Sequence, residues 1–131
     1  MAYQYYQPNP KKQSVGDCVI RAICRATGDD WYSVYTQVTL QGYSLADMPS
    51  SNSVWGKYLK DNGYKRYIVP TNCPDCYTIA EFVEEHPKGT FIICTGSHVV
   101  AAIDGNYYDS WDSGSESPIF YYQKEEENAE P

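Results

Sequence analysis

The chain has few basic residues and no long apolar run, and each shortage excludes a class of partner. No segment approaches the roughly 18 apolar residues of a membrane span, and the opening MAYQYYQPNPKKQ lacks the apolar core of a signal peptide. Ten lysines and arginines are scattered against seventeen acidic residues, which gives a net charge of -7. Because clustered basic residues supply the affinity for phosphate backbones, we expect no nucleic acid partner. From the missing apolar segments we expect no membrane contact and a cytoplasmic location.

Cysteine is present, but in an odd number. Five cysteines without a secretory signal suit a reducing compartment better than a framework of disulfides. Some of these thiols are therefore candidates for chemistry. Their positions are Cys18, Cys24, Cys73, Cys76 and Cys94.

The aromatic content is that of a folded protein. Fourteen tyrosines and three tryptophans, with 42% apolar residues overall, exclude a disordered chain. The length of 131 residues suits one core, and no repeat or linker divides it. We expect a single domain over residues 1–131, with an extended arm at 1–16 and a solvated acidic tail at 124–131.

Four segments show the helical spacing of apolar residues, and each is bounded by a capping or breaking residue. The last of them is TIAEFVEEHPKG, which stops at its proline. The expected helices are about 18–27 between Asp17 and Gly28, a second after Asp29 or Asp30, a third from Ser51–Ser53 to Asn62–Gly63, and a short fourth before Pro87.

Strand patterns dominate the rest of the chain. A short strand is expected at Tyr64–Val69, and the runs TFIICT, HVVAAI, NYYDSW and PIFYY follow the fourth helix. Asp104–Gly105 is the strongest hairpin signal. Helices first and strands after predict an α+β domain, in which amino-terminal helices pack on a carboxy-terminal antiparallel sheet.

Cys18 falls in the first turn of the first expected helix. Unpaired backbone N–H groups and the positive end of the helix dipole lower the pKa of a thiol there, and the same groups can bind the oxyanion of an attacked carbonyl. Cys24 lies in the middle of that helix and is expected to pack as a small apolar residue. Cys18 is therefore the candidate nucleophile.

A thiolate nucleophile needs a base, and the chain contains two histidines. His86 precedes Pro87, where the fourth helix ends, and its ring is expected on an exposed turn. His98 opens the HVVAAI strand, a rigid element suited to presenting a base. His98 is therefore the candidate base.

The hairpin register selects the neighbour of His98. If Asp104–Gly105 is a two-residue turn, the alternation of side chains places Asp109 on the same face as His98. A three-residue turn would present Asp112 or Ser110 instead, but the two-residue turn is the commoner solution. A carboxylate beside the ring fixes its tautomer and raises its basicity.

Most of the larger aromatic residues are expected in the core. Trp111 differs, because it shares a face with His98 and its ring can shield the histidine–aspartate bond from water. Tyrosines of the arm and of the segment FYYQ can form a surface for a partner. The residues expected in the core are Trp31, Tyr35, Trp55 and Tyr58.

The order of these elements resembles a known family. A cysteine that opens a helix in GDCVIRAICRATG, a second helix with WYSVY, and later strands with a histidine and an aspartate are similar to a compact papain-like cysteine peptidase of bacteria and phages. The resemblance covers about residues 14–60 and 78–113. It implies that Cys18 is the nucleophile, His98 the base and Asp109 the residue that orients it.

The resemblance also implies the chemistry and the partner. It implies attack on an acyl carbon through a thioester, a protein or peptide substrate and no cofactor; isopeptidases, amidases and acyltransferases share these groups. Papain-like enzymes place a side-chain amide before the cysteine in the oxyanion hole. Gln13 takes that place here, with Asn9 as the other candidate.

Two other interpretations remain. The pair Cys73 and Cys76 has C-x2-C spacing and, with Cys94 and His98, would make a Cys3His zinc site. The apolar strands beside Cys94 do not need a metal to fold, which disfavours zinc. The second is a non-catalytic binding module, which would use the same cleft or the aromatic surface to hold a protein.

Overall fold

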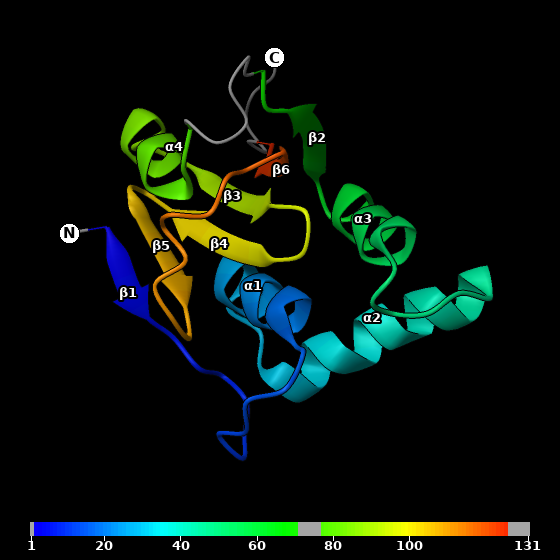
Figure 1. Ribbon diagram of the computed structural model, residues 1–131. Coiled ribbons are helices and arrows are strands. Elements are labelled where there is room, and N and C mark those ends of the chain that lie inside the picture. The colour runs from blue at the N-terminus through cyan, green and yellow to red at the C-terminus, as the bar shows by residue number, and fades with distance from the viewer. Residues whose placement is uncertain (1, 71–76, 126–131) are drawn as a thin grey trace.

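The computed structural model describes residues 2–70 and 77–125. These residues form four helices and one open, six-stranded sheet in the order β1-β5-β4-β3-β6-β2, a mixed α and β architecture (Figure 1). The elements are β1 Tyr3–Tyr5, α1 Cys18–Thr27, α2 Trp31–Leu45, α3 Asn52–Asp61, β2 Tyr64–Ile68, α4 Ile79–Glu85, β3 Thr90–Cys94, β4 Val99–Ile103, β5 Asn106–Asp109 and β6 Phe120–Lys124.

The sheet differs from the predicted one at an edge. β1 lies within the predicted extended arm and pairs with β5 in parallel, with Tyr3 opposite Tyr107. The sheet is therefore mixed, and the prediction of a purely antiparallel, carboxy-terminal sheet was wrong at this edge. A strand of only three residues shows too little alternation to be recognised from sequence. The opposite edge is β2, which pairs antiparallel with β6.

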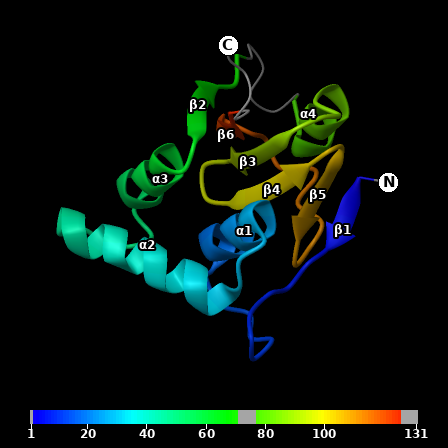
Figure 2. The same ribbon diagram turned by 180° about the vertical axis from the view of Figure 1, so that it is seen from behind.

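Helices cover both faces of the sheet (Figures 1 and 2). Ile92 and Ala101 belong to a core cluster shared with α1, α2 and α3, whereas Phe91 and Ala102 belong to one shared with α4. Because both faces are buried, the central strands β3 and β4 are continuous apolar runs.

The β4–β5 hairpin has the predicted two-residue turn. Asp104 and Gly105 both adopt left-handed conformations, with φ of 48° and 88°, as a type I′ turn requires. Ile103 therefore lies opposite Asn106. β5 ends at Asp109, two residues before the predicted strand NYYDSW would have ended.

The helix starts follow the prediction in position but not always in chemistry. Asp17 is the N-cap residue of α1, as predicted, but its side chain makes no capping hydrogen bond, because its carboxylate accepts hydrogen bonds from Arg21 and Trp31 instead. Asp30, the second of two candidates, does cap α2 by accepting from the backbone N–H of Ser33. The position of Asp17 is thus confirmed, while ion pairing with Arg21 takes the carboxylate oxygens that a capping bond would use.

The predicted acidic tail overlaps the sheet. Lys124 ends β6, and the backbone N–H of Glu125 donates to the Gly63 carbonyl at 2.8 Å. Residues 126–131 of the tail lie outside the described residues. Over the ranges the structure describes, no helix has the length and apolar character to cross a membrane.

Candidate active site

The structure brings Cys18, His98 and Asp109 together at one end of the sheet. Cys18 begins α1, His98 immediately precedes β4, and Asp109 ends β5. The Nε2–H of His98 donates to Asp109 Oδ2 at 2.6 Å. The predicted neighbour is confirmed, and Asp112 instead accepts from the Tyr107 hydroxyl.

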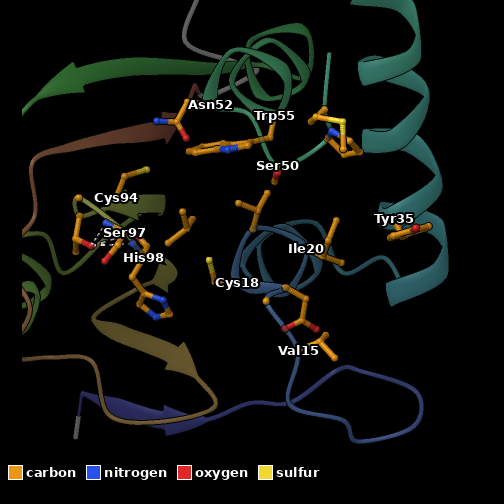
Figure 3. Close-up of a pocket in the computed structure, with 18 of the residues that line it drawn as sticks. Val15, Cys18, Ile20, Tyr35, Ser50, Asn52, Trp55, Cys94, Ser97 and His98 are labelled. Carbon is orange, nitrogen blue, oxygen red and sulfur yellow. Dashed lines mark hydrogen bonds between the residues drawn. The ribbon is translucent and has the colours of Figure 1, made fainter. Parts of the chain in front are cut away.

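The Cys18 thiol is half-buried and faces the histidine (Figure 3). Burial alone would raise the pKa of Cys18, but the hydrogen bond and positive charge of His98, together with the Val99 backbone and Arg21, lower it below its ordinary value. By contrast, burial raises the pKa of Cys24 to about 12 and also raises the pKa of Cys94. Among the three cysteines described, Cys18 alone has the electrostatics of a nucleophile.

The pKa of His98 is shifted in the opposite direction. Burial would lower the pKa of its ring, but the hydrogen bonds and charges of Asp109 and Cys18 raise it to about 9. The lowered pKa of Cys18 and the raised pKa of His98 both favour the thiolate–imidazolium form of the pair over the neutral form. Since Nε2 is bonded to Asp109, Nδ1 is the nitrogen that exchanges a proton with Cys18.

Asp109 is fully buried and saturated with donors. Oδ1 accepts from the Arg21 guanidinium at 3.1 and 3.0 Å and from the Ser110 backbone N–H at 2.8 Å. Oδ2 accepts from the Ser113 hydroxyl at 2.6 Å as well as from His98. Burial would raise the pKa of Asp109, but these bonds and the two cations lower it, so the carboxylate stays charged.

Arg21 is a site residue that sequence reasoning missed. It is buried in α1 and bridges two carboxylates, with Nη1 at 2.8 Å from Asp17 Oδ1. The other Asp17 oxygen accepts from the Trp31 indole N–H at 2.9 Å. Its signal in the sequence was an arginine inside the apolar stripe of a helix, four residues after an aspartate.

Thr95 and Ser113 were missed as well. The Thr95 hydroxyl accepts from the His98 backbone N–H at 2.9 Å, and the Thr95 N–H donates to the His98 carbonyl at 2.8 Å. Ser113 is fully buried on Asp109. Both residues lie in loops, where no periodicity marks a functional position.

A cavity of about 530 Å³ opens beside Cys18 and His98. Its walls come mainly from α1, α2, α3 and the β3–β4 connection. Three of the aromatic residues predicted for the core line it, namely Trp31, Tyr35 and Trp55. The core prediction was wrong for Tyr35, which is 49% exposed and stacks on Trp31 at 5.1 Å.

Trp111 contacts His98 as predicted. The two ring centroids are 4.9 Å apart, and Trp111 remains 45% exposed. Its ring therefore covers one side of the histidine from solvent while keeping its own outer surface in water.

The predicted oxyanion residues lie elsewhere. Gln13 is exposed, and its backbone N–H donates to Asn9 Oδ1 at 3.3 Å. The same Asn9 oxygen accepts from the Lys11 N–H at 2.9 Å, which closes a local turn. Neither Gln13 nor Asn9 lines the cavity, so the geometry gives no support to an oxyanion role for either side chain.

His86 is not on an exposed turn, which corrects the prediction. Its ring stacks on Phe82 at 3.9 Å between centroids, and Nδ1–H donates to the Phe82 carbonyl at 2.7 Å. The ring is half-buried because the aromatic side chains beside α4 pack around it.

The alternative zinc site stays a prediction. Cys73 and Cys76 lie outside the described residues. Of the other two proposed ligands, Cys94 is buried and His98 is bonded to Asp109. Elsewhere in residues 2–70 and 77–125, no group of three or more histidine, cysteine or acidic side chains is arranged to hold a metal ion.

Comparisons with protein-family models, with curated proteins and with solved structures find no match for this chain. The assignment of function therefore rests on the residues and geometry of the site itself.

Proposed function

We propose that the protein is a thiol-dependent acyl hydrolase or acyltransferase, of the papain-like cysteine peptidase type, that acts on a protein or peptide. The observation that supports this most strongly is the buried contact from Cys18 through His98 to Asp109, with 2.6 Å between the last two side chains. A thiolate, an imidazolium and an orienting carboxylate are the three groups that this chemistry needs.

In the first half-reaction the Cys18 thiolate attacks the carbonyl carbon of an amide. The S–C bond forms and the carbonyl oxygen takes the negative charge, which the backbone N–H groups at the start of α1 can bind. The C–N bond then breaks as His98 gives its Nδ1 proton to the leaving nitrogen. The products of this step are a free amine and a thioester on Cys18.

In the second half-reaction the neutral His98 takes a proton from water, or from an acceptor amine, as that molecule attacks the thioester. The C–S bond breaks, and the acyl group leaves as an acid or as a new amide. Asp109 stays ionised in both halves and holds the ring by Nε2–H. The histidine therefore returns to its starting charge after each cycle.

Alkylation by iodoacetamide, with the modified residue located by mass spectrometry, tests the nucleophile. We expect Cys18 to react first and its rate to fall less between pH 8 and pH 6 than that of an ordinary thiol, because the pKa of Cys18 is lowered. An ordinary thiol with a pKa of about 8.5 would slow roughly 100-fold over that interval. A Cys73→Ser/Cys76→Ser variant removes two competing thiols.

Two outcomes decide against the proposal. Fastest alkylation of Cys24 or Cys94 would contradict Cys18 as nucleophile. A reactive Cys18 with no cleavage or transfer across a peptide library, and no difference on Cys18→Ala, would leave the non-catalytic binding module as the better account.

A further inference from the structure

The outward face of α2 carries no charge. The fifteen residues Trp31–Leu45 include no lysine, arginine, aspartate or glutamate, although 21% of the chain is charged. The inward face packs in the core through Val34 and Val38. The outward face of such a helix is ordinarily charged or polar. Here it exposes large apolar side chains, namely Tyr32 (57% exposed), Tyr35 (49%), Leu40 (60%) and Tyr43 (85%).

The side chains of this face are arranged symmetrically about the middle of α2. A row of residues spaced by four, three and four positions runs along the face, because residues with these spacings are neighbours on a helix surface. The two outer members of the row are tyrosines and the two inner members are threonines, so the row is the same from either end. Tyr35 and Leu40 flank the row at equal distances from its centre. The row consists of Tyr32, Thr36, Thr39 and Tyr43.

A face with this symmetry matches itself when two copies of the helix pack antiparallel. In a twofold interface, residue i of one copy contacts residue j of the other, and j contacts i in return. Threonines at the centre of the row let the two helix backbones approach, while the larger side chains fill the space on either side. The pairs between the two copies would be Tyr32 with Tyr43, Thr36 with Thr39, and Tyr35 with Leu40.

The area of this face is large enough for a specific dimer. With about 200 Å² for a whole tyrosine side chain, the exposed parts of Tyr32, Tyr35 and Tyr43 amount to roughly 400 Å². Leu40 and the polar residues between them raise the value to about 500 Å² per copy. Two copies would therefore bury about 1,000 Å² in total, the area that a specific interface needs at least.

The charge of the chain leaves few other surfaces for self-association. With a net charge of -7, two copies repel each other, but α2 adds no charge to a contact between them. Asp30 and Asp47 lie beyond the two ends of the helix, where salt screens them. Figures 1 and 2 show α2 at the edge of the molecule, on the opposite side from α4, so a second copy can lie along it.

We propose that the protein forms a twofold dimer in which α2 of one copy packs antiparallel against α2 of a second copy. A second copy fits this face better than an unrelated protein, because an unrelated partner would not require the face to be symmetric. The dimer does not depend on the function proposed above, since Cys18, His98 and Asp109 belong to other elements. Tyr35 also lines the cavity beside Cys18, so the interface adjoins that cavity.

Sedimentation velocity of the full chain over a series of concentrations, with reductant present, tests the association. We expect the mean mass to rise with concentration toward twice that of one chain. Tyr43→Glu should raise the dissociation constant about 10-fold or more, because it places two carboxylates in an apolar interface. Tyr5→Glu is the matched control. It adds the same charge at a tyrosine that is 69% exposed on β1, and it should leave the dissociation constant unchanged.

A compensating pair of substitutions tests the antiparallel arrangement. Tyr32→Lys alone should weaken the dimer, as Tyr43→Glu does. The double variant Tyr32→Lys/Tyr43→Glu should associate at least several-fold more tightly than either single variant, because each lysine then faces a glutamate of the other copy. Within one copy the two positions are about 16 Å apart along the helix, so they cannot pair with each other there.

Three results would overturn the proposal. The first is a chain that stays monomeric at every concentration; if Tyr43→Glu then lowered kcat/KM on a protein substrate, the face would hold that substrate instead. The second is a dimer that Tyr43→Glu leaves intact, since its interface would lie elsewhere. The third is a double variant that associates no more tightly than Tyr43→Glu, which would contradict the antiparallel pairing. None of these results concerns the nucleophile, which iodoacetamide tests separately.

Discussion

His98 and His86 lie in two regions of the molecule with different surroundings. His98 lies where β4 begins, between the Cys18 thiol and the buried Asp109 carboxylate. His86 follows α4, and its ring stacks on Phe82 among other aromatic side chains. Both rings are partly buried. The His98 ring bonds to the Asp109 carboxylate and to Cys18, whereas the His86 ring donates to a backbone carbonyl.

The difference lies in the charges around each ring. Asp109 and Cys18 raise the pKa of His98 to about 9 in spite of burial. The described contacts of His86 are the Phe82 carbonyl and aromatic rings, which fix the orientation of its ring but supply no reacting partner. A histidine becomes a catalytic candidate when a thiol lies on one ring nitrogen and a carboxylate on the other.

Replacing each histidine by alanine gives the largest expected contrast. His98→Ala should lower kcat/KM on a peptide substrate by about 10²- to 10⁴-fold, because the general acid and base is lost. His86→Ala should leave kcat/KM nearly unchanged and lower the melting temperature, since it removes a stacked ring from beside α4. Similar kinetic losses in both variants would show that the contrast between the regions concerns stability alone.

Asp109→Asn and Asp112→Asn test the carboxylate of the His98 region. Asp109→Asn should lower turnover by more than 10-fold but by less than the roughly 10⁴-fold of serine proteases, since a preformed thiolate depends less on the base. Asp112→Asn should cost little, because Asp112 bonds to Tyr107 and to the Gly114 backbone instead. A larger loss in Asp112→Asn would contradict the hairpin register as the basis of the site.

The contact between His98 and Asp109 should also determine how activity depends on pH. The imidazolium of His98 protonates the leaving amine, so activity should fall as pH rises through its pKa of about 9. In Asp109→Asn that alkaline limb should move to lower pH, because burial then favours the neutral ring. An unchanged limb would mean that Asp109 does not set the pKa of His98.

The elements that could be predicted from sequence have local signals. Cys18 follows from a helix start, and Asp109 follows from a two-residue turn that fixes which residues share a face. Asp109 shares a face with His98 because side chains alternate with a period of two along both strands. These signals suffice to predict that Cys18, His98 and Asp109 lie together at one site.

The parts that could not be predicted depend on contacts between distant segments or on loops. The parallel pairing of β1 with β5 joins residues about a hundred positions apart, and nothing in Tyr3–Tyr5 specifies it. Arg21 is a charged residue on a helix that packs against the sheet, and only the folded structure shows that it forms an ion pair with Asp109. The exposure of Tyr35 follows from the cavity beside it, which periodicity does not describe.

Of the variants expected to lower activity, those of Arg21 give the smallest kinetic effect, and they test the ion pairs that hold Asp109 in the His98 region. Arg21→Lys keeps the charge but loses the forked guanidinium that joins Asp109 to Asp17, so turnover should fall only several-fold.

Arg21 also lowers the pKa of Asp109, and the ionised Asp109 carboxylate contributes stability that is lost on acidification. Arg21→Met should therefore unfold at a higher pH than the unmodified protein when acid is added, and should lose about 3–5 kcal/mol near neutral pH. Arg25→Lys is the matched control, because Arg25 lies over the Tyr108 ring and bonds to neither carboxylate. Arg25→Met loses the same positive charge as Arg21→Met, so equal shifts of the acid unfolding midpoint in these two variants would show that Arg21 acts through net charge alone, not through contact with Asp109.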